Sequence, residues 1–330
     1  MQPPLVFVLV VNWNGAEHLR ECFGSLLAGH YANARFLLID NASHDGSAAL
    51  VRETFGSDPR VEVLECPRNL GWAGGNNAGI ERALAANADH ISIDRFRSVD
   101  LVVTTKPDRT PVTDADQAVE RSIRSGIEAA RPGDSILGEE YGTQGSSSRQ
   151  WIIDPIDGTA NFLRGVPIWG TLIALAINGV PVVGVVSAPA LGKRWWAATG
   201  HGAWGQAEGE QPRRLAVSGV SDLADASLSY NSLQGWDGEG RVDDVIALSR
   251  AVWRSRAIGD MWSYMLLAEG ALDIVGEFDL KPYDMAALIP IVEEAGGRFT
   301  SISGEPGPWH GNAIATNGAL HEKVLAALVR

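Results

Sequence analysis

Two carboxylates in one short segment are the residues best placed to do chemistry. An apolar run from Trp151 ends in Asp154, and the proline that follows fixes φ, so we expect the chain to turn there. Asp157 comes three residues later, close enough for both carboxylates to face one point. Gly158 and Thr159 then open a predicted short helix, whose free N–H groups suit a phosphate. Because two acids would repel a phosphate, we predict that magnesium lies between the carboxylates and the phosphate. The alternative is a capped turn with solvated acids.

Further acidic residues stand at the ends of other predicted elements. Glu139 and Glu140 come directly after a predicted apolar strand, although an exposed Glu pair is a weak signal by itself. Asp284 stands at a predicted helix start, where its alternative role is an N-terminal cap. Carboxylates gathered at several element ends match a multi-metal phosphoryl-transfer site, in which one ion activates water and another stabilises the leaving oxygen.

The elements that must position these acids follow two patterns. In the first ninety residues apolar strands alternate with helical segments, which predicts a parallel sheet: strands at 5–12, 35–40 and 61–65, helices at 19–27, 47–55 and about 76–89, and a glycine-rich loop at 69–75. After Asp94 the pattern becomes mixed α/β: a helix from about 114, a hairpin with Asn178–Gly179 as its turn, strands at 194–198, 227–230, 271–277 and 313–317, and helices at 243–253, 261–270, 283–295 and the C-terminus.

Composition excludes several classes of protein. The 27 Lys and Arg residues against 40 Asp and Glu residues give a net charge of -13, which disfavours nucleic-acid binding. The longest apolar runs, Leu5–Val11 and Thr171–Ile177, are much shorter than the roughly 20 residues that cross a bilayer. Cys22 and Cys66 cannot form a disulfide framework or fill a zinc site alone. With no secretory leader pattern, we predict a soluble cytoplasmic protein that binds neither nucleic acid nor membrane.

Residues from about 95 to 330 resemble the inositol monophosphatase superfamily of magnesium-dependent, lithium-sensitive phosphatases. The first signature is Trp151–Phe162, read WIIDPIDGTANF, and the second is Tyr283–Gly297, read YDMAALIPIVEEAGG. The runs Thr105–Asp116 and Gly138–Glu140 complete the set in the family's order. The resemblance implies a layered α/β/α/β sugar-phosphatase fold, a cofactor of two or three Mg²⁺ ions, and inhibition by lithium.

The same resemblance implies a role for each matching position. The metal ligands it implies are Glu139, Asp154, Asp157, Asp284 and the backbone carbonyl of Ile156. Gly158 and Thr159 correspond to the phosphate-binding helix start, and Glu139 is counted among the catalytic residues as well as the ligands. Thr159 and Asp116 correspond to the pair that orients the nucleophilic water, in which Asp116 accepts a proton through Thr159.

Within the superfamily the strongest resemblance is to histidinol-phosphate phosphatases, which act in histidine biosynthesis. It is carried by the runs Lys106–Asp108 and Pro111–Asp116, the Gly259–Asp260 pair, the run Leu280–Asp284 and the run Ser187–Trp196. Histidinol phosphate carries an ammonium and an imidazole, so its pocket needs anionic or acceptor groups beyond the metal ligands. Asp260 and Glu277 are the candidates, and we expect them to bind substrate together with Gly158, Thr159 and Asp284. The alternatives are that Asp260 only caps the helix after it, and that the substrate is inositol 1-phosphate or a broad set of small phosphomonoesters.

The first ninety residues resemble rhamnosyltransferase-like glycosyltransferases of the family-two type. The runs that carry this resemblance are VNWNG from Val11, IDNASHDGS from Ile39 and NLGWAGGNNAG from Asn69. The resemblance implies that Asp40 and Asp45 lie in the nucleotide part of a sugar-nucleotide site. The metal-binding Asp-x-Asp pattern is missing where it is expected, since residues 91–95 read ISIDR, and no catalytic-base or acceptor half follows. We therefore predict no transferase chemistry.

The domain organisation that follows is a partial, Rossmann-like nucleotide-binding fragment at 1–80 and a phosphatase domain at 81–330, with the helix at 81–94 shared. A natural fusion, a chimera and a truncated interaction module all remain open for the fragment. We expect an inert appendage with weak or absent nucleotide-sugar binding, because a half-sheet leaves an exposed edge. The expected partner is a small-molecule phosphate ester, and a homodimer stays open because no pattern sets the oligomeric state.

Overall fold

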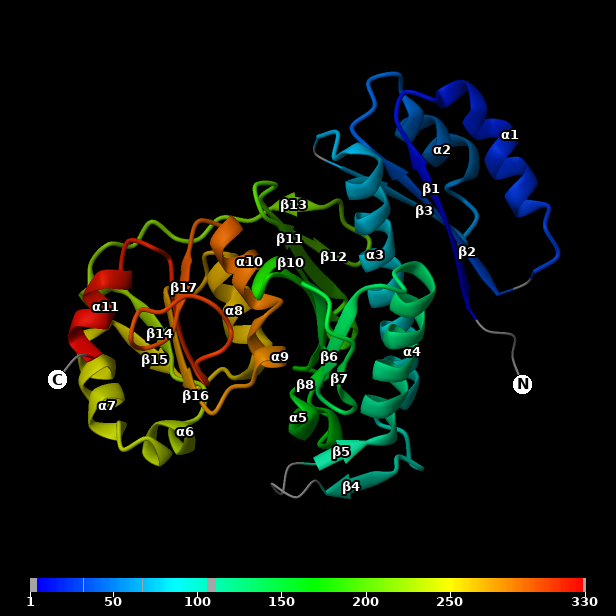
Figure 1. Ribbon diagram of the computed structural model, residues 1–330. Helices are drawn as coiled ribbons and strands as arrows, with labels where there is room; N and C mark the ends of the chain where they lie inside the picture. The colour runs from blue at the N-terminus through cyan, green and yellow to red at the C-terminus, as the bar shows by residue number, and fades with distance from the viewer. Residues whose placement is uncertain (1–4, 32, 67, 106–110, 329–330) are drawn as a thin grey trace. The chain divides into compact units, whose positions relative to one another are not determined.

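The computed structural model describes residues 5–31, 33–66, 68–105 and 111–328 (Figure 1). The Lys106–Asp108 part of the predicted motif lies outside these residues. The chain divides into two compact units, Met1–Asn87 and Ala88–Arg330. None of the described helices is both long and apolar enough to cross a membrane.

The first unit contains a three-stranded parallel sheet in the order β1-β2-β3. The strands and the two helices between them are β1 (Val6–Asn12), α1 (Ala16–Leu27), β2 (Ala34–Asp40), α2 (Ser47–Phe55) and β3 (Val61–Glu65). Phe23 on α1 and Val51 on α2 are fully buried and share one apolar cluster with Phe36 and Leu38 of β2. The predicted parallel sheet and its bounds are therefore confirmed to within about one residue.

Helix α3 (Gly71–Arg95) corrects the predicted loop at 69–75 and the predicted helix at about 76–89, because it begins earlier and ends later than expected. Its start is fixed by the Asn69 side chain, which accepts from the N–H of Gly71 at 2.8 Å. Of the glycines in the predicted loop, Gly71 has a positive φ of +70°, and Gly75 packs closely, since a Cβ there would lie 2.9 Å from Cγ1 of Val11. A Cβ on Gly79 would lie 2.7 Å from Cδ1 of Ile39, so only glycine lets α3 approach the sheet there.

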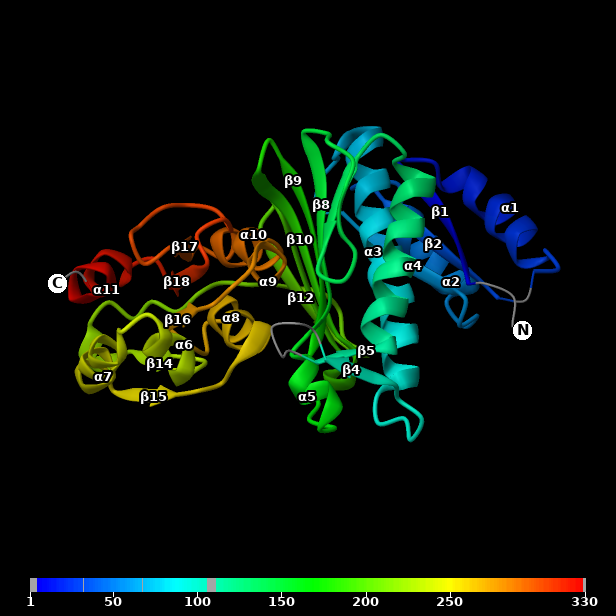
Figure 2. The same cartoon turned by 60° about the horizontal axis from the view of Figure 1, so that its bottom comes forward.

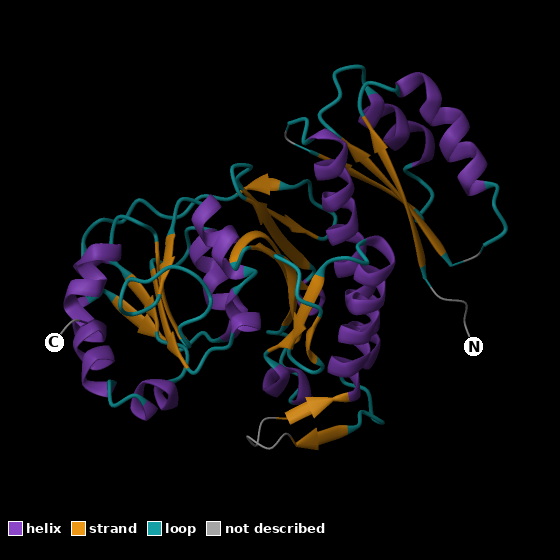
Figure 3. Ribbon diagram, in the orientation of Figure 1, coloured by secondary structure: helices purple, strands orange, loops and turns teal. Residues whose placement is uncertain are grey.

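The second unit is built on an eight-stranded sheet in the order β13-β12-β11-β10-β9-β8-β6-β7. Figure 3 draws the strands of the protein in orange. Its strands are β6 (Ser135–Gly138), β7 (Gly142–Gln144), β8 (Arg149–Asp157), β9 (Gly170–Ile177), β10 (Val180–Ala188), β11 (Lys193–Ala198), β12 (Ala203–Ala207) and β13 (Arg213–Arg214). The predicted hairpin joins β9 and β10, and both turn residues, Asn178 and Gly179, have the positive φ that such a turn requires (53° and 80°).

A second sheet, of five strands in the order β15-β14-β16-β18-β17, forms another layer of this unit. Its strands are β14 (Ser227–Ser229), β15 (Arg254–Arg256), β16 (Ile274–Phe278), β17 (Arg298–Thr300) and β18 (Asn312–Thr316), and a separate small ladder joins β4 (Val103–Thr105) to β5 (Pro111–Thr113). The helices of the unit are α4 (Asp114–Ala130), α5 (Thr159–Leu163), α6 (Leu233–Gly238), α7 (Val242–Ala251), α8 (Asp260–Ala268), α9 (Pro282–Met285), α10 (Leu288–Glu294) and α11 (His321–Leu328).

The layers of the second unit confirm the predicted α/β/α/β order. Helix α4 covers one face of the large sheet, and α8 and α10 pack between the two sheets (Figures 1 and 2). The α6, α7 and α11 helices add a further layer on the far side of the five-stranded sheet. The main core cluster joins Trp195 of the large sheet to Met265 of α8 and Val292 of α10.

Two predicted elements near the acidic residues differ from the structure. The expected helix at 283–295 is two helices, α9 and α10. Pro290 has no N–H to donate to the carbonyl of Ala286, so the hydrogen bonding of a continuous helix is interrupted there. The expected turn at Pro155 is instead an irregularity inside β8, where pairing with β9 jumps from Asp154–Leu172 to Asp157–Gly170. A proline has no N–H to give to the ladder, and a bulge accommodates it without ending the strand.

Candidate active site

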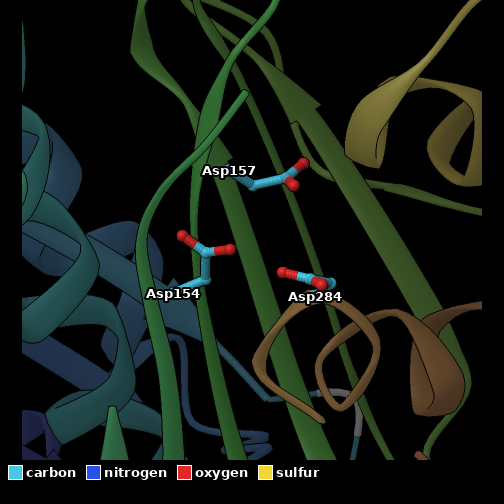
Figure 4. Close-up of side chains that lie close together, drawn as sticks. All are labelled: Asp154, Asp157 and Asp284. Carbon is cyan, nitrogen blue, oxygen red and sulfur yellow. The ribbon is translucent and has the colours of Figure 1, made fainter. Parts of the chain in front are cut away.

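Three aspartates converge at the end of β8. Oxygen atoms of Asp154, Asp157 and Asp284 all lie within 4.8 Å of one another, and Figure 4 shows the three carboxylates turned toward a common space. Asp154 is buried, whereas Asp157 and Asp284 are half-buried. The bulge in β8 aims the first two acids at this point, and the short helix α9 presents the third from a stretch more than a hundred residues later.

The backbone on either side of these aspartates is held by hydrogen bonds. The hydroxyl of Thr171 donates to the carbonyl of Pro155 at 2.9 Å, and the hydroxyl of Thr159 donates to the carbonyl of Ile156 at the same distance. The N–H of Lys281 donates to Asp284 at 2.7 Å, which fixes one carboxylate oxygen of that residue. The carbonyl of Ile156, predicted as a metal ligand, therefore lies at the site and is already bonded by Thr159.

The predicted water-orienting pair is present as a contact. Oγ1 of Thr159 lies 3.3 Å from Oδ1 of Asp116. The other oxygen of Asp116 accepts from the N–H of Thr113 at 2.7 Å and from its hydroxyl at 2.5 Å, in the capping box that begins α4. Asp116 is fully buried, and burial raises the pKa of its carboxyl to about 6.

Glu139 stands apart from the three clustered aspartates. It follows β6, and its N–H donates to the carbonyl of Ile153 on β8 at 3.2 Å. After burial, its charge is a further cause that raises the pKa of Asp154, Asp284 and Asp116. The structure thus brings three of the four predicted side-chain ligands into one group and places the fourth within electrostatic reach.

The electrostatics of this group fit a divalent cation. Burial and neighbouring carboxylates raise the pKa of Asp154 and of Asp157 well above the usual value, and burial raises that of Asp284 to about 7. Among the described residues, Oδ1 of Asp154 is buried with no hydrogen-bond partner. A buried carboxylate oxygen without a partner is costly, and hard oxygen ligands at this separation suit Mg²⁺.

A pocket beside the aspartates contains two more acids. Its lining includes Asp157 and Asp284 from the cluster, Asp260 and Glu277 from elsewhere, and Tyr264. Glu277 lies in β16, near the strand end as predicted, and burial raises the pKa of its carboxyl to about 8. One Glu277 oxygen accepts from the Tyr264 hydroxyl at 3.0 Å and from the amide of Asn231 at 2.6 Å.

Asp260 does not cap the helix that it begins. The N-cap of α8 is Gly259, which has no side chain to cap the helix. The N–H of Met261, in the first turn, donates to Asp157 at 2.6 Å. The carboxylate of Asp260 instead accepts from the amide of Asn161 on α5 at 2.6 Å. Asp260 has a φ of +47°, a backbone conformation that a non-glycine residue adopts at a cost of about 1–3 kcal/mol and that is common at functional sites.

Several residues of this site were not predicted from the sequence. Asn161 and Asn231 orient Asp260 and Glu277, Thr113 anchors Asp116, and Tyr264 lines the pocket. Asn161 falls inside the first signature, WIIDPIDGTANF, so its position could have identified it as a candidate site residue. Asn231 gives no local signal, because its role depends on β14 pairing with β16.

The family of the chain is decided by comparison with known sequences. Residues 78–330 match the model of the inositol monophosphatase family. The chain belongs to this family. A histidinol-phosphatase of Streptomyces coelicolor is 53% identical over 253 residues, which are 76% of this chain and 95% of that protein. A histidinol-phosphatase of Mycobacterium tuberculosis is 55% identical over 247 residues, 74% of this chain and 95% of that protein.

Solved structures of the inositol monophosphatase family share this fold. An inositol monophosphatase from Zymomonas mobilis superposes with a TM-score of 0.68 at 33% identity and covers 77% of this chain and 97% of its own. One from Thermotoga maritima gives a TM-score of 0.68 at 31% identity, with 77% and 96% covered. The predicted fold class is therefore confirmed. Separately, residues 7–86 match the model of glycosyl transferase family 2.

The two aspartates predicted for a nucleotide site serve the local structure of the first unit. Asp40 is buried and accepts from the amide of Asn12 at 3.2 Å and from the N–H of Ser43 at 3.2 Å. Asp45 accepts from the N–H of Ala16 at 2.9 Å and from the N–H and hydroxyl of Ser47, and these hydrogen bonds lower the pKa of Asp45. Both carboxylates thus tie the loops after β1 and β2 together.

Proposed function

We propose that this chain is a magnesium-dependent phosphatase that hydrolyses histidinol phosphate to histidinol and inorganic phosphate. The proposal rests on the cluster of Asp154, Asp157 and Asp284 in a chain that is 53–55% identical to two histidinol-phosphatases over 95% of their length. It carries the expectation that two or three Mg²⁺ ions bind and that lithium inhibits. A homodimer and a cytoplasmic location stay predictions.

In this proposal Glu139, the three clustered aspartates and the Ile156 carbonyl hold the cations. Bound Mg²⁺ would lower the pKa of a water molecule and neutralise the charge of the ester oxygens. Thr159 accepts a hydrogen bond from the attacking water and, after its hydroxyl turns from the Ile156 carbonyl, passes a proton to Asp116, whose Oδ1 lies 3.3 Å away. A carboxyl whose pKa is about 6 is an effective base near neutral pH. The N–H groups at Gly158 and Thr159 bind the phosphate.

The substrate preference is assigned to the acids that do not hold cations. Asp260 and Glu277 line the same pocket as Asp157 and Asp284, and neither is paired with a basic side chain in the hydrogen bonds described above. Two acceptors in a half-enclosed pocket suit the ammonium and imidazole N–H groups of histidinol phosphate, which inositol phosphate lacks. Hydrolysis of inositol 1-phosphate is the second candidate, favoured by a 33%-identical inositol-1-monophosphatase of Rhizobium meliloti.

The experiment that tests this function offers the purified chain histidinol phosphate and inositol 1-phosphate in separate assays with Mg²⁺, and measures released phosphate. We expect faster release from histidinol phosphate, no release after chelation with EDTA, and no release by the Asp154→Asn variant. Asp260→Asn should reduce kcat/KM for histidinol phosphate more than for inositol 1-phosphate, by about tenfold or more, since a lost charge-assisted hydrogen bond costs about 1.5–3 kcal/mol. An equal loss on both substrates would refute the assignment of Asp260.

For the glycosyltransferase-like fragment, residues 1–80, we propose no transferase activity and no tight nucleotide-sugar binding. The structural roles of Asp40 and Asp45 support this, because both carboxylates are occupied by local hydrogen bonds. Titration of the full chain with UDP- and dTDP-sugars by calorimetry tests it. Micromolar binding would overturn the proposal and make the unit a functional nucleotide-sugar module.

A further inference from the structure

A buried ion pair on α4 holds the turn that carries Glu139. Glu120 is fully buried, and its two carboxylate oxygens accept from the N–H of Glu140 at 2.7 Å and from the N–H of Tyr141 at 3.2 Å. Arg124, one helical turn further on, donates through Nε to Oε1 of Glu120 at 2.7 Å. The carboxylate therefore binds two consecutive backbone groups directly after Glu139.

Arg124 also binds strand β7, which follows the turn. Its guanidinium donates to the carbonyl of Gly142 at 2.5 Å and to the side chain of Gln144 at 3.3 Å. The packing is close on the other side as well, since a Cβ on Gly138 would lie 1.9 Å from Oε1 of Glu120. The ion pair therefore contacts the turn between β6 and β7 along its whole length, and position 138 must be glycine to leave room for the Glu120 carboxylate.

The cost of this arrangement suggests a purpose beyond stability. A buried ion pair loses its hydration, and apolar residues of similar volume are often equally stabilising. Glu120 and Arg124 lie outside the lining of the pocket beside the aspartates, so neither touches substrate in the proposed reaction. What the pair fixes is the backbone of Glu139, which is bonded to Ile153 at its own N–H and to Glu120 at the following N–H.

Helix α4 carries both this ion pair and a residue of the proposed active site. Asp116, Glu120 and Arg124 follow one another at intervals of four residues, so they lie along one face of the helix. The first of them bonds Thr159 and the other two bond the turn after β6. One rigid helix therefore sets the positions of the water-orienting pair and of the Glu139 turn together.

We propose that Glu120 and Arg124 are positioning residues that set Glu139 for cation binding; this rests on the proposed role of Glu139 as a ligand. Partners outside the ligand set typically contribute about 10–100-fold to metal affinity. Loosening the turn should therefore weaken cation binding about tenfold. Because excess Mg²⁺ restores occupancy, kcat at saturating Mg²⁺ should stay within about twofold of wild type.

Two variants perturb the pair from opposite sides. Glu120→Gln removes the charge and one acceptor oxygen, and Gly138→Ala pushes a methyl group into the carboxylate. The matched control is Glu128→Gln, on the same helix, where an exposed Glu accepts from Gln144 at 2.8 Å. Binding is measured with Mn²⁺ as the probe, by the electron paramagnetic resonance of the free ion, and the Mg²⁺ dependence of phosphate release is measured in parallel.

The expected result is Mn²⁺ binding about tenfold weaker and a Mg²⁺ activation midpoint about tenfold higher in both variants, with the control unchanged. Wild-type affinity in both folded variants would overturn the proposal, and so would failure of both to fold, because the pair would then serve stability alone. A wild-type chain that binds Mn²⁺ but releases no phosphate would refute the proposed function, while the binding comparison would still decide the role of the pair.

Discussion

Replacing Asp154 by Asn should stabilise the cation-free protein while abolishing its activity. In the absence of cations, Asp154 is a buried carboxylate with an unpartnered oxygen and two other carboxylates within 4.8 Å. Two unit charges at that separation repel by about 3.5 kcal/mol at an effective dielectric constant of about 20. Protonation relieves part of this repulsion, and the new amide leaves a buried N–H group to satisfy at about 1 kcal/mol or more. We therefore expect a net gain of about 1–2 kcal/mol at pH 8.

The sign of this effect depends on pH. The folded-state pKa of Asp284 is raised to about 7, and those of Asp154 and Asp157 are raised as well, so the folded protein prefers these groups protonated. Their stabilising contribution is complete below the unfolded-state pKa of about 4 and is lost as the pH rises toward 7. The gain from Asp154→Asn should therefore be largest at pH 8 and close to zero at pH 5.

Thermal unfolding with EDTA and with Mg²⁺ measures both effects. At pH 8 with EDTA, the Tm of the variant should exceed that of wild type by about 2–8 °C, given about 2–4 °C per kcal/mol for a unit of this size. Mg²⁺ should raise the Tm of wild type and leave that of the variant almost unchanged.

The matched control is Asp273→Asn, the same chemical change at a buried Asp. The Asp273 carboxylate accepts from the N–H of Ser227 at 2.7 Å and from its hydroxyl at 2.9 Å, so this substitution should lower Tm with or without Mg²⁺. A lower Tm for Asp154→Asn than for wild type in EDTA at pH 8 would refute the reasoning, because it would mean that the carboxylate is favourable there without a cation.

Three further predictions concern single residues. Burial lowers the pKa of His321 to about 4, so its contribution to stability is present above the unfolded-state pKa of about 6.5 and is lost as the pH falls; the stability difference between wild type and His321→Gln, from urea unfolding, should shrink by about 2 kcal/mol between pH 7 and pH 5. Thr159→Val should lower kcat at least about 100-fold with little change in Tm, since it removes the hydroxyl beside Asp116 that passes the proton; a retained kcat would exclude that role. Gly158→Ala should lower both Tm and kcat, because φ is +84° and a Cβ would lie 3.0 Å from the Ile168 carbonyl; an unchanged Tm would contradict the predicted strain.

Elements with a local signal were predicted from the sequence to within a residue or two. Helix α2, strand β3 and the hairpin turn at Asn178–Gly179 depend on nearby residues, and the structure has them as expected. The acidic cluster was predicted from the signatures that carry Asp154 and Asp284. The break between α9 and α10 also had a local signal, which the prediction of one helix overlooked: Pro290 has no N–H to donate to the carbonyl of Ala286.

The partners of the supporting side chains could not be predicted, for a different reason. Asn161 reaches Asp260 across 99 positions of the chain, and Asn231 reaches Glu277 across 46. Asparagine is equally typical of a turn or a helix start, so the residue type at either position does not reveal a partner that only the tertiary fold supplies. Sequence patterns therefore identified the acids that hold charge, and the structure was needed to identify the amides that orient them.

Helix α3 shows how packing can defeat a periodicity argument. Its apolar residues form no single stripe, because its two ends belong to different units and pack against different residues. Gly79 packs against Ile39 in the first unit, whereas Asp89 accepts from the hydroxyl of Ser187 at 2.8 Å and is paired with Arg194 in the second. The division between the units falls inside this helix, after Asn87. A helix whose packing partners change along its length has no constant amphipathic face. The length of α3 could therefore not be inferred from the spacing of its apolar residues.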